Sequence, residues 1–291
     1  MKKILLILCL SLLLVSCGEK KTKRDVYSSL HEIDTALATE FPFDVHSEAY
    51  LLIRLNDLKV LYRKNEKEKI YPASLTKVLT MDTVLHNVQD TGETSSLSSY
   101  QYWDLIARNA SVAYLDTDHE YSVEDLLYAL ILPSGADAAV ALGNLFERKG
   151  EDLVEKMNDL SSDLSLSSSH FTNPTGLHDD DLYTSVEDLL SITLDTLSFL
   201  PGRMVLESTS HTAEDGTLLR STVSPLLNEE AEILGGKTGF TGQAGQNLLL
   251  LFRYEERSYL LILTGAQGDP GYGEYYHYDD AREVLERLFY E

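Results

Sequence analysis

The chain has 291 residues, of which 43% are hydrophobic and 24% are charged, a composition typical of a globular protein and not of a disordered one. This length accommodates one large domain or two modest ones. The formal net charge of -23 argues against nucleic-acid binding, because phosphate backbones repel an acidic surface.

The first seventeen residues have the pattern of an export signal. Two lysines precede an apolar stretch from Ile4 to Leu14, which is too short to span a bilayer comfortably. The stretch runs into the sequence Leu-Val-Ser-Cys at 14–17, which resembles the lipobox of bacterial lipoproteins. We therefore expect residues 1–16 to be a signal peptide and Cys17 to carry a diacylglycerol. Two acyl chains would anchor the protein to the cell membrane on its extracytoplasmic side. A plain secretory signal is the alternative.

The two cysteines of the chain, Cys9 and Cys17, both lie in this N-terminal region. A domain that follows them has no thiol, which excludes a disulfide scaffold, a cysteine nucleophile and a cysteine zinc site. Residues 17–42 are predicted to form a polar tether, whose basic cluster between Lys20 and Arg24 either rests on anionic lipid or remains solvated. Because no second linker follows, residues 43–291 are predicted to form one catalytic domain.

The pattern of apolar residues changes twice along this predicted domain. Short runs at Ala49–Arg54 and Leu58–Arg63, separated by Asn56-Asp57, predict a β-hairpin. Helical periodicity follows at 74–88, 122–133, 136–146, 151–164 and 185–197, a second hairpin at 246–254 and 258–265, and a last helix at 279–290. Strands near both ends with helices between them predict an α/β (α+β) fold, in which an antiparallel sheet of terminal strands carries an inserted helical block.

Ser74 and Lys77 form the first candidate catalytic motif. They stand three residues apart at the start of a predicted helix, so the hydroxyl and the amine share one face. A serine hydroxyl is a weak nucleophile that needs a base, and a lysine can serve when burial or a nearby cation lowers its pKa. Taken alone the motif is weak, since two surface residues on a helix give the same pattern.

Two further motifs offer groups for a peptide substrate. Lys237, Thr238 and Gly239 stand in a glycine-rich run, where Lys237 could attract a carboxylate and lower the pKa of Lys77, and Thr238 adds a hydroxyl. Ser134, in the sequence Ser-Gly-Ala, could relay a proton to a leaving amine. A glycine-rich turn and a helix-capping serine are the alternative interpretations of these two motifs.

The order of these motifs and their surroundings resemble a known family. Three segments, Tyr71–Lys77, Tyr121–Leu130 and His170–Leu177, are similar to segments of the D-alanyl-D-alanine carboxypeptidases, the low-molecular-mass penicillin-binding proteins. The likeness runs from about Glu48 to the C-terminus. It implies a β-lactamase/transpeptidase-like fold and a serine-type D-Ala-D-Ala carboxypeptidase that acts on peptidoglycan stem peptides. It also implies inhibition by β-lactams and the use of no cofactor and no metal.

The resemblance assigns the proton-handling roles. It implies that Ser74 attacks the carbonyl of the penultimate D-Ala, that Lys77 accepts the hydroxyl proton, and that Ser134 relays a proton to the departing D-Ala. The acyl-enzyme would then react with water, giving hydrolysis, or with an amine, giving transpeptidation. The sequence does not distinguish a carboxypeptidase from an endopeptidase or a transpeptidase.

The resemblance also implies how the substrate is held. Lys237 and Thr238 would bind the terminal carboxylate, and Gly239 would let the substrate backbone approach the strand closely. The backbone N–H groups of Ser74 and Phe240 would form the oxyanion hole, a contribution worth a few kcal/mol of barrier in such enzymes.

Ala136 marks a departure from the family, which usually has Asn at that position. The missing amide motivates one alternative, a non-catalytic relative that binds peptidoglycan or a partner protein. A β-lactamase is the other alternative, but its class A form needs a glutamate four residues before an asparagine, and Glu155 precedes Asn158 by three. A zinc peptidase is poorly supported, since no His-Glu-x-x-His motif occurs.

Overall fold

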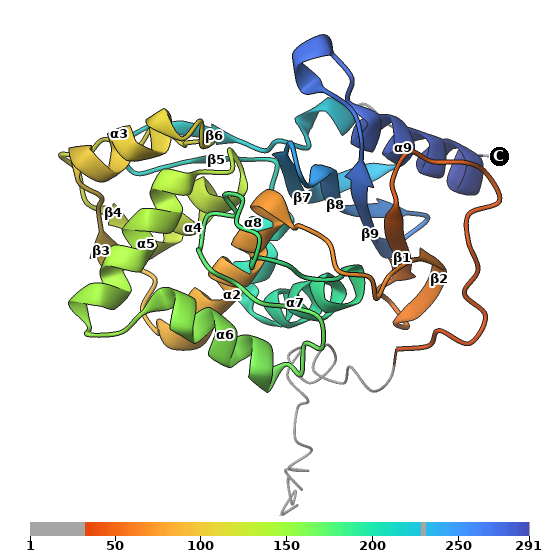
Figure 1. Cartoon of the computed structure of the whole chain (residues 1–291), viewed down its shortest axis with the longest axis horizontal. Helices are drawn as coiled ribbons and strands as arrows, with labels where there is room; N and C mark the ends of the chain where they lie inside the picture. The colour runs from red at the N-terminus through yellow and green to blue at the C-terminus, as the bar shows by residue number, and fades with distance from the viewer. Residues whose placement is uncertain (1–32, 228–230, 291) are drawn as a thin grey trace, which may run out of the picture.

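The computed structural model describes residues 33–227 and 231–290. An antiparallel sheet lies on one side of the molecule and a block of helices on the other (Figure 1). The predicted signal peptide and Cys17 lie outside the described residues. Of the predicted tether, residues 33–42 are described, and within them Asp34 and Thr39 form isolated parallel bridges with Lys59 and Tyr62.

The sheet has five strands in the order β2–β1–β9–β8–β7. Its strands are β1 (Ala49–Arg54), β2 (Lys59–Lys64), β7 (Glu232–Thr241), β8 (Gly245–Tyr254) and β9 (Arg257–Ala266). The two predicted hairpins are confirmed as β1–β2 and β8–β9, and β1 pairs with β9, so the two ends of the chain build one sheet. The predicted arrangement of terminal strands is therefore confirmed, and β7, with its Lys237-Thr238-Gly239 motif, forms an edge of this sheet.

The helical block is inserted between β2 and β7. It contains α2 (Thr76–Asn87), α3 (Ser99–Ala107), α4 (Val123–Ile131), α5 (Ala136–Arg148), α6 (Leu153–Asp163), α7 (Val186–Ser198) and α8 (Leu200–Leu206), with two short strand pairs, β3 (Thr94–Ser95) with β4 (Tyr121–Ser122) and β5 (Ser210–Thr212) with β6 (Leu218–Arg220). Side chains at the starts of α4, α6 and α7 accept backbone N–H groups of the first turn, from Ser122, Asp152 and Ser185 respectively. These caps explain why the starts of the three helices could be predicted closely.

Helices cover both faces of the sheet. On one face α7 packs against β1 and β9, and α8 packs against β7. Helix α2 packs on α7 within the same apolar core, and every residue of α2 from Thr76 to Leu85 is buried. On the other face α9 (Tyr276–Leu285) packs against β8 and β9. Burial on both faces explains the nearly continuous apolar sequence of the central strands. Among the described residues, no single helix is long and apolar enough to cross a membrane. Helices α7 and α8 reach that length and apolar composition only when taken together, and a bend of 116° separates them.

Two helix predictions differ from the structure, and two helices were not predicted. The segment predicted as one helix from Ser74 begins with a 3-10 turn, Ala73–Leu75, before α2 starts at Thr76. The last helix starts at Tyr276, three residues before the predicted start, and continues as a π-helical turn, Glu286–Tyr290. Helices α3 and α8 were not predicted, although Ser98 and Gln101 form a capping box at the start of α3.

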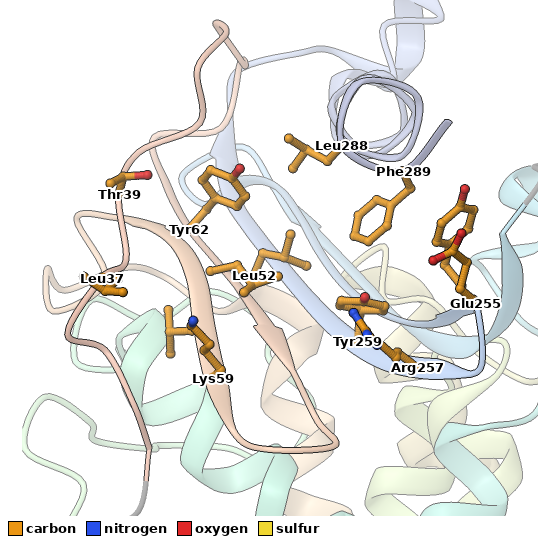
Figure 2. A pocket seen from close by; sticks show the side chains of 13 residues that line it. Leu37, Thr39, Leu52, Lys59, Tyr62, Glu255, Arg257, Tyr259, Leu288 and Phe289 are labelled. Atoms are coloured by element: carbon orange, nitrogen blue, oxygen red, sulfur yellow. The ribbon is translucent and has the colours of Figure 1, made fainter. Parts of the chain in front are cut away.

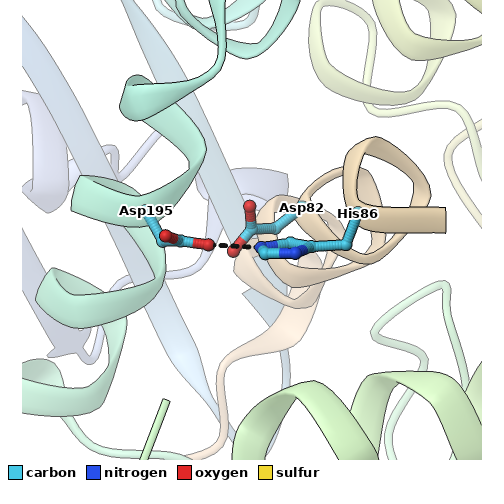
Figure 3. Close-up of side chains that lie close together, drawn as sticks. All are labelled: Asp82, His86 and Asp195. Carbon is cyan, nitrogen blue, oxygen red and sulfur yellow. Dashed lines mark hydrogen bonds and ion pairs between the residues drawn. The ribbon is translucent and has the colours of Figure 1, made fainter. Parts of the chain in front are cut away.

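Three side chains of kinds that can bind a metal ion lie between α2 and α7. The side chains of Asp82, His86 and Asp195 point toward one another, and their ligand atoms lie within 4.8 Å of one another (Figure 3). The His86 Nε2 and the Asp195 Oδ2 are hydrogen-bonded at 2.5 Å, a contact that links the two helices.

A separate cavity of about 450 Å³ lies on the α9 side of the sheet (Figure 2). Leu52, Tyr62, Tyr259 and Phe289 contribute to its wall. None of the predicted site residues lines this cavity, so the candidate chemistry lies elsewhere.

Candidate active site

The predicted nucleophile and base lie side by side at the start of α2. The Ser74 Oγ is 3.1 Å from the Lys77 Nζ, as their spacing of three residues predicts. Ala73, immediately before the serine, has a positive φ of 49°, which is uncommon for a residue other than glycine. The sharp turn into the helix leaves Ser74 partly exposed while its neighbours Ala73 and Leu75 are buried.

Lys77 is held in a state suited to accept a proton. Its side chain is almost completely buried, and burial lowers its pKa to about 7, against a smaller opposing effect of the Asp137 carboxylate. Its Nζ also lies 2.5 Å from the Thr175 carbonyl oxygen, to which it donates a hydrogen bond. A neutral amine has two N–H groups and one lone pair, so donation to Thr175 leaves the lone pair available to the Ser74 hydroxyl.

The loop that presents the Thr175 carbonyl is ordered by Asn173. The Asn173 Oδ1 accepts hydrogen bonds from the Thr175 N at 3.1 Å, the Thr175 Oγ1 at 2.7 Å and the Gly176 N at 2.8 Å. Gly176 has a φ of +75°, and a Cβ atom there would lie 2.0 Å from the Ala73 carbonyl oxygen. Only glycine permits this close approach, so the loop and the nucleophile turn fit together at this position.

Strand β7 carries Lys237 and Gly239 to the Ser74–Lys77 pair. A Cβ atom on Gly239 would lie 3.1 Å from the Ser74 N, so the strand backbone passes directly beside the nucleophile turn. Lys237 is completely buried, and its Nζ donates to the Thr238 carbonyl oxygen at 2.6 Å. Burial, and then the charge of Lys77, hold the pKa of Lys237 well below its usual value.

The sequence allowed two causes for a lowered pKa of Lys77, burial and the charge of Lys237. Burial is the largest cause in the structure. The coupling between the two amines is seen at Lys237, whose own pKa is reduced by the charge on Lys77. Both amines are fully buried, so the charge on one is poorly screened from the other.

A cleft of about 430 Å³ opens beside the pair. Its wall includes Ser74, Lys77, Ala136, Phe240 and Thr241, together with Arg108, Asn109, Ser111 and His178, which the sequence analysis did not select for the site. The last four come from the end of α3 with its following loop and from the loop after Thr175. Each of these four is a common polar residue in a loop, so no sequence pattern distinguished it.

Ser134 lies just before α5, in the turn that leads into this helix. It is buried with a positive φ of 67°, and the N-cap residue of α5 is Gly135, so the serine does not cap this helix. Among the described residues, no hydrogen bond joins Ser134 to Ser74 or Lys77, and Ser134 is not part of the cleft wall. Its predicted relay role stays a prediction.

The position of Ala136 in the cleft is set by the next residue. The Asp137 carboxylate accepts hydrogen bonds from the Ala113 N at 2.8 Å and the Leu115 N at 3.1 Å. These bonds fix the segment that follows α3 against the start of α5. The methyl group of Ala136 therefore stands in the wall without adding a hydrogen-bonding group.

Asn247 on β8 joins the nucleophile turn to the sheet, and the sequence analysis did not select it. It is completely buried, and its Nδ2 donates to the backbone carbonyl oxygens of Tyr71 at 3.0 Å and of Pro72 at 3.1 Å. Its Oδ1 accepts from the Gly265 N at 2.9 Å. All the hydrogen bonds of this side chain thus connect the segment before Ser74 to two strands.

The Asn247→Leu substitution is expected to destabilise the protein by about 2–3 kcal/mol, because it leaves several buried polar groups unpaired. It should also slow acylation of Ser74 in the protein that remains folded. Denaturant unfolding and penicillin labelling measure the two effects. Asn144→Leu is the matched control, since Asn144 bonds Ser96 and Gln101 away from the cleft. Equal acylation rates in the two variants would contradict the positioning role.

Comparison with known proteins gives one family. A family model described as D-alanyl-D-alanine carboxypeptidase matches residues 35–266. The D-alanyl-D-alanine carboxypeptidase DacF of Bacillus subtilis is 29% identical over 202 residues, which cover 68% of this chain and 52% of that protein. DacA of Haemophilus influenzae is 29% identical over 218 residues, covering 72% of this chain and 54% of that protein. The chain thus spans about half the length of these relatives.

Solved structures agree on the fold. The Streptomyces K15 DD-transpeptidase matches with a TM-score of 0.73 at 21% identity, over 84% of this chain and 97% of that one. Penicillin-binding protein D2 of Listeria monocytogenes, in its ampicillin-bound form, matches with a TM-score of 0.69 at 24% identity, over 83% of this chain and 97% of that one. These matches confirm the predicted transpeptidase-like fold.

Proposed function

Because this chain belongs to the D-alanyl-D-alanine carboxypeptidase family, we propose that it is a serine DD-peptidase that removes the terminal D-Ala from peptidoglycan stem peptides. The observation that carries the proposal is the Ser74–Lys77 pair, 3.1 Å apart in an open cleft, with the pKa of Lys77 lowered to about 7. A nucleophile with a base in the required protonation state is the minimal set for acyl transfer.

The first chemical step is acylation. The Ser74 hydroxyl gives its proton to the neutral Lys77 amine, and its Oγ forms a bond to the carbonyl carbon of the penultimate D-Ala. The Thr175 carbonyl keeps the amine turned toward Ser74. The backbone N–H groups of Ser74 and Phe240 are assigned to the developing oxyanion, which supports the tetrahedral intermediate electrostatically.

Collapse of this intermediate breaks the peptide bond. The nitrogen of the departing D-Ala takes up a proton from Lys77, relayed through Ser134, and leaves as a free amino acid. Water then attacks the acyl carbonyl with Lys77 as its base, which releases the shortened peptide and restores Ser74. An amine in place of water would give transpeptidation. β-Lactams that acylate Ser74 would inhibit the enzyme in the same way.

Lys237 and Thr238 are assigned to the terminal carboxylate. The half-buried Thr238 can donate a hydroxyl hydrogen bond from the strand edge. Lys237 is buried beneath it with a lowered pKa, and a carboxylate nearby favours the charged form of such an amine. Binding of the substrate carboxylate is therefore expected to raise the pKa of Lys237.

The two alternative functions are less well supported. A class A β-lactamase needs a glutamate base at the cleft, whereas Glu155 is exposed on α6 and is not among the residues that line the cleft. A non-catalytic relative has no need of a buried lysine with a lowered pKa beside a serine, an arrangement that costs stability. Ala136 removes one hydrogen-bonding group but leaves this pair intact.

The predicted export signal supports a location. We place the protein outside the cytoplasm as a lipoprotein held at the membrane through Cys17, a proposal that rests on the sequence at 14–17. Stem peptides of peptidoglycan are accessible there.

Fluorescent penicillin labelling tests the function. The full-length protein in mild detergent is expected to form a covalent adduct that persists for hours and to release D-Ala from a pentapeptide ending in D-Ala-D-Ala. An adduct that forms and disappears within minutes would favour the β-lactamase alternative. A folded protein that neither labels nor releases D-Ala would favour the non-catalytic one.

A further inference from the structure

Three large aromatic side chains near the catalytic cleft are exposed to solvent. Tyr100 and Trp103 on α3 are 84% and 65% exposed, and Tyr114 in the loop after this helix is 78% exposed. Exposed apolar side chains that lie together mark interaction sites, whereas scattered single ones do not. None of the three has a role in the chemical steps described above.

Tyr102 connects these side chains into one aromatic surface, formed by Tyr100, Trp103 and Tyr114. Tyr100 and Trp103 are three residues apart, so they share one face of α3. The rings of Tyr102 and Trp103 meet edge to face with centroids 5.6 Å apart. Burial, and then the charges of Asp137 and Tyr114, raise the pKa of the Tyr102 phenol. Its hydroxyl therefore lies near the loop tyrosine.

The backbone around Tyr114 keeps its ring exposed. The Asp137 carboxylate accepts hydrogen bonds from the N–H groups of both neighbours, Ala113 and Leu115, which are buried. Between them Tyr114 has a φ of +62°, a conformation that costs free energy for a bulky residue. The loop thus holds the ring in solvent at the expense of backbone strain.

The aromatic surface is continuous with the cleft. The segment 108–111, which lines the cleft, joins α3 to the loop of Tyr114. Trp103 lies five residues before this segment, about 7.5 Å along a helix. The loop then returns beside the helix, where the hydroxyls of Ser99 and Thr117 are hydrogen-bonded at 2.9 Å.

The proposed function, on which this inference rests, indicates a ligand for the surface. Stem peptides are joined at their N-terminus to the sugar chain of peptidoglycan. In a pentapeptide, the three residues before the penultimate D-Ala span roughly 11 Å when extended. A peptide whose reacting carbonyl lies at Ser74 therefore brings its sugar chain to the rim of the cleft.

The chemistry of the surface fits a sugar chain. A pyranose ring has an apolar face of C–H groups that packs on a flat aromatic ring, and its edge hydroxyls can bond to phenol and indole groups. Tyrosine and tryptophan side chains also lose little conformational entropy on binding. Sugar rings carry no charge, so the protein's net charge of -23 does not repel them.

A membrane is another partner that exposed tryptophan and tyrosine side chains contact. The position of the aromatic surface argues against it. Figure 1 shows α3 and β2 at opposite ends of the molecule, and the described part of the tether pairs with β2 through Asp34 and Thr39. The tether therefore joins the domain at the end away from this surface.

We propose that Tyr100, Trp103 and Tyr114 bind the sugar chain of peptidoglycan, on which pyranose rings stack while the attached stem peptide occupies the cleft. The enzyme would then prefer a glycan-linked peptide to a free one. The three aromatic residues contribute binding and take no part in the chemical steps.

Intrinsic fluorescence tests the binding directly, because Trp103 is the single tryptophan of the chain. Titration of the full-length Ser74→Ala protein in mild detergent with the N-acetylglucosamine tetramer is expected to change the emission saturably. Adding Tyr114→Ala should weaken binding about fivefold, the scale of one lost aromatic contact. Tyr272→Ala is the matched control, since Tyr272 is 85% exposed in the turn after β9 and does not line the cleft. It should bind as before.

Two substrates test the consequence for catalysis. One is the free pentapeptide L-Ala-γ-D-Glu-L-Lys-D-Ala-D-Ala, and the other is the same peptide joined to its N-acetylglucosamine–N-acetylmuramic acid disaccharide. The full-length protein is expected to release D-Ala from the glycan-linked peptide with a kcat/KM about tenfold higher. The double variant Trp103→Ala/Tyr114→Ala should reduce this preference to about twofold.

An emission that does not respond to the saccharide, or an undiminished preference in the double variant, would overturn the glycan site while penicillin labelling still supported the proposed function. A blue shift of the Trp103 emission on transfer from detergent into lipid vesicles, without a response to the saccharide, would overturn it in favour of a membrane contact. Saccharide binding by a protein that neither labels nor releases D-Ala would support the glycan site and overturn the proposed function.

Discussion

Replacing Ser74 with alanine is expected to abolish the covalent penicillin adduct and to lower kcat for D-Ala release by roughly 10⁶-fold, the scale seen when a catalytic serine is removed. The physical reason is that no other described hydroxyl is hydrogen-bonded to the Lys77 amine. Mass spectrometry of the protein after incubation with penicillin measures the adduct directly, and thermal unfolding checks that the variant is folded.

Ser111→Ala is the matched control for this experiment. Ser111 is an exposed serine that lines the same cleft, and its removal should change labelling by no more than a few-fold. An adduct that persists in Ser74→Ala would mean that another residue is the nucleophile, and the proposed mechanism would be wrong.

The acylation rate of the unmodified protein is expected to fall about tenfold for each pH unit below 7 and to level off above it. Lys77 accepts a proton only when neutral, and burial lowers its pKa to about 7. Below this pH the amine is protonated and the rate is lost, so the rate rises with pH through the pKa. Stopped-flow labelling between pH 5 and 9 gives the profile.

The Lys77→Met substitution should lower the acylation rate by about 10²–10⁴-fold and remove this pH dependence, because the general base is gone while an apolar chain fills the same space. Lys77→Arg is the companion variant, since a guanidinium retains the positive charge but cannot lose its proton. A midpoint near 10 in the unmodified protein, or full activity in the arginine variant, would show that Lys77 is not the base.

The elements predicted best are those determined by residues close together in the sequence. The hairpin of β1 and β2 depends on apolar runs and an Asn-Asp turn within sixteen residues, and the start of α4 depends on the Ser122 cap. The Ser74–Lys77 contact belongs to the same class, because helical geometry alone brings residues three apart onto one face.

The support of the site depends on residues far apart in the chain. Thr175 follows Lys77 by 98 positions, and Asn247 follows Tyr71 by 176. Ser134 is buried at a positive φ of 67° that its motif does not predict, and its relay role stays a prediction. A sequence pattern does not indicate which carbonyl or amide from a distant part of the chain will contact the site residues.

The sequence by itself determined which residues could act: a serine and a lysine on one helical face, a lysine-threonine-glycine strand, and an order of strands and helices that places both in one domain. Tertiary structure alone decided whether Lys77 has a pKa low enough for it to act as a base. The pKa of Lys77 depends on how completely α2 is enclosed by its neighbours, and burial is the largest cause of its shift. Helical spacing is a property of neighbouring residues, whereas desolvation is a property of the whole packed core.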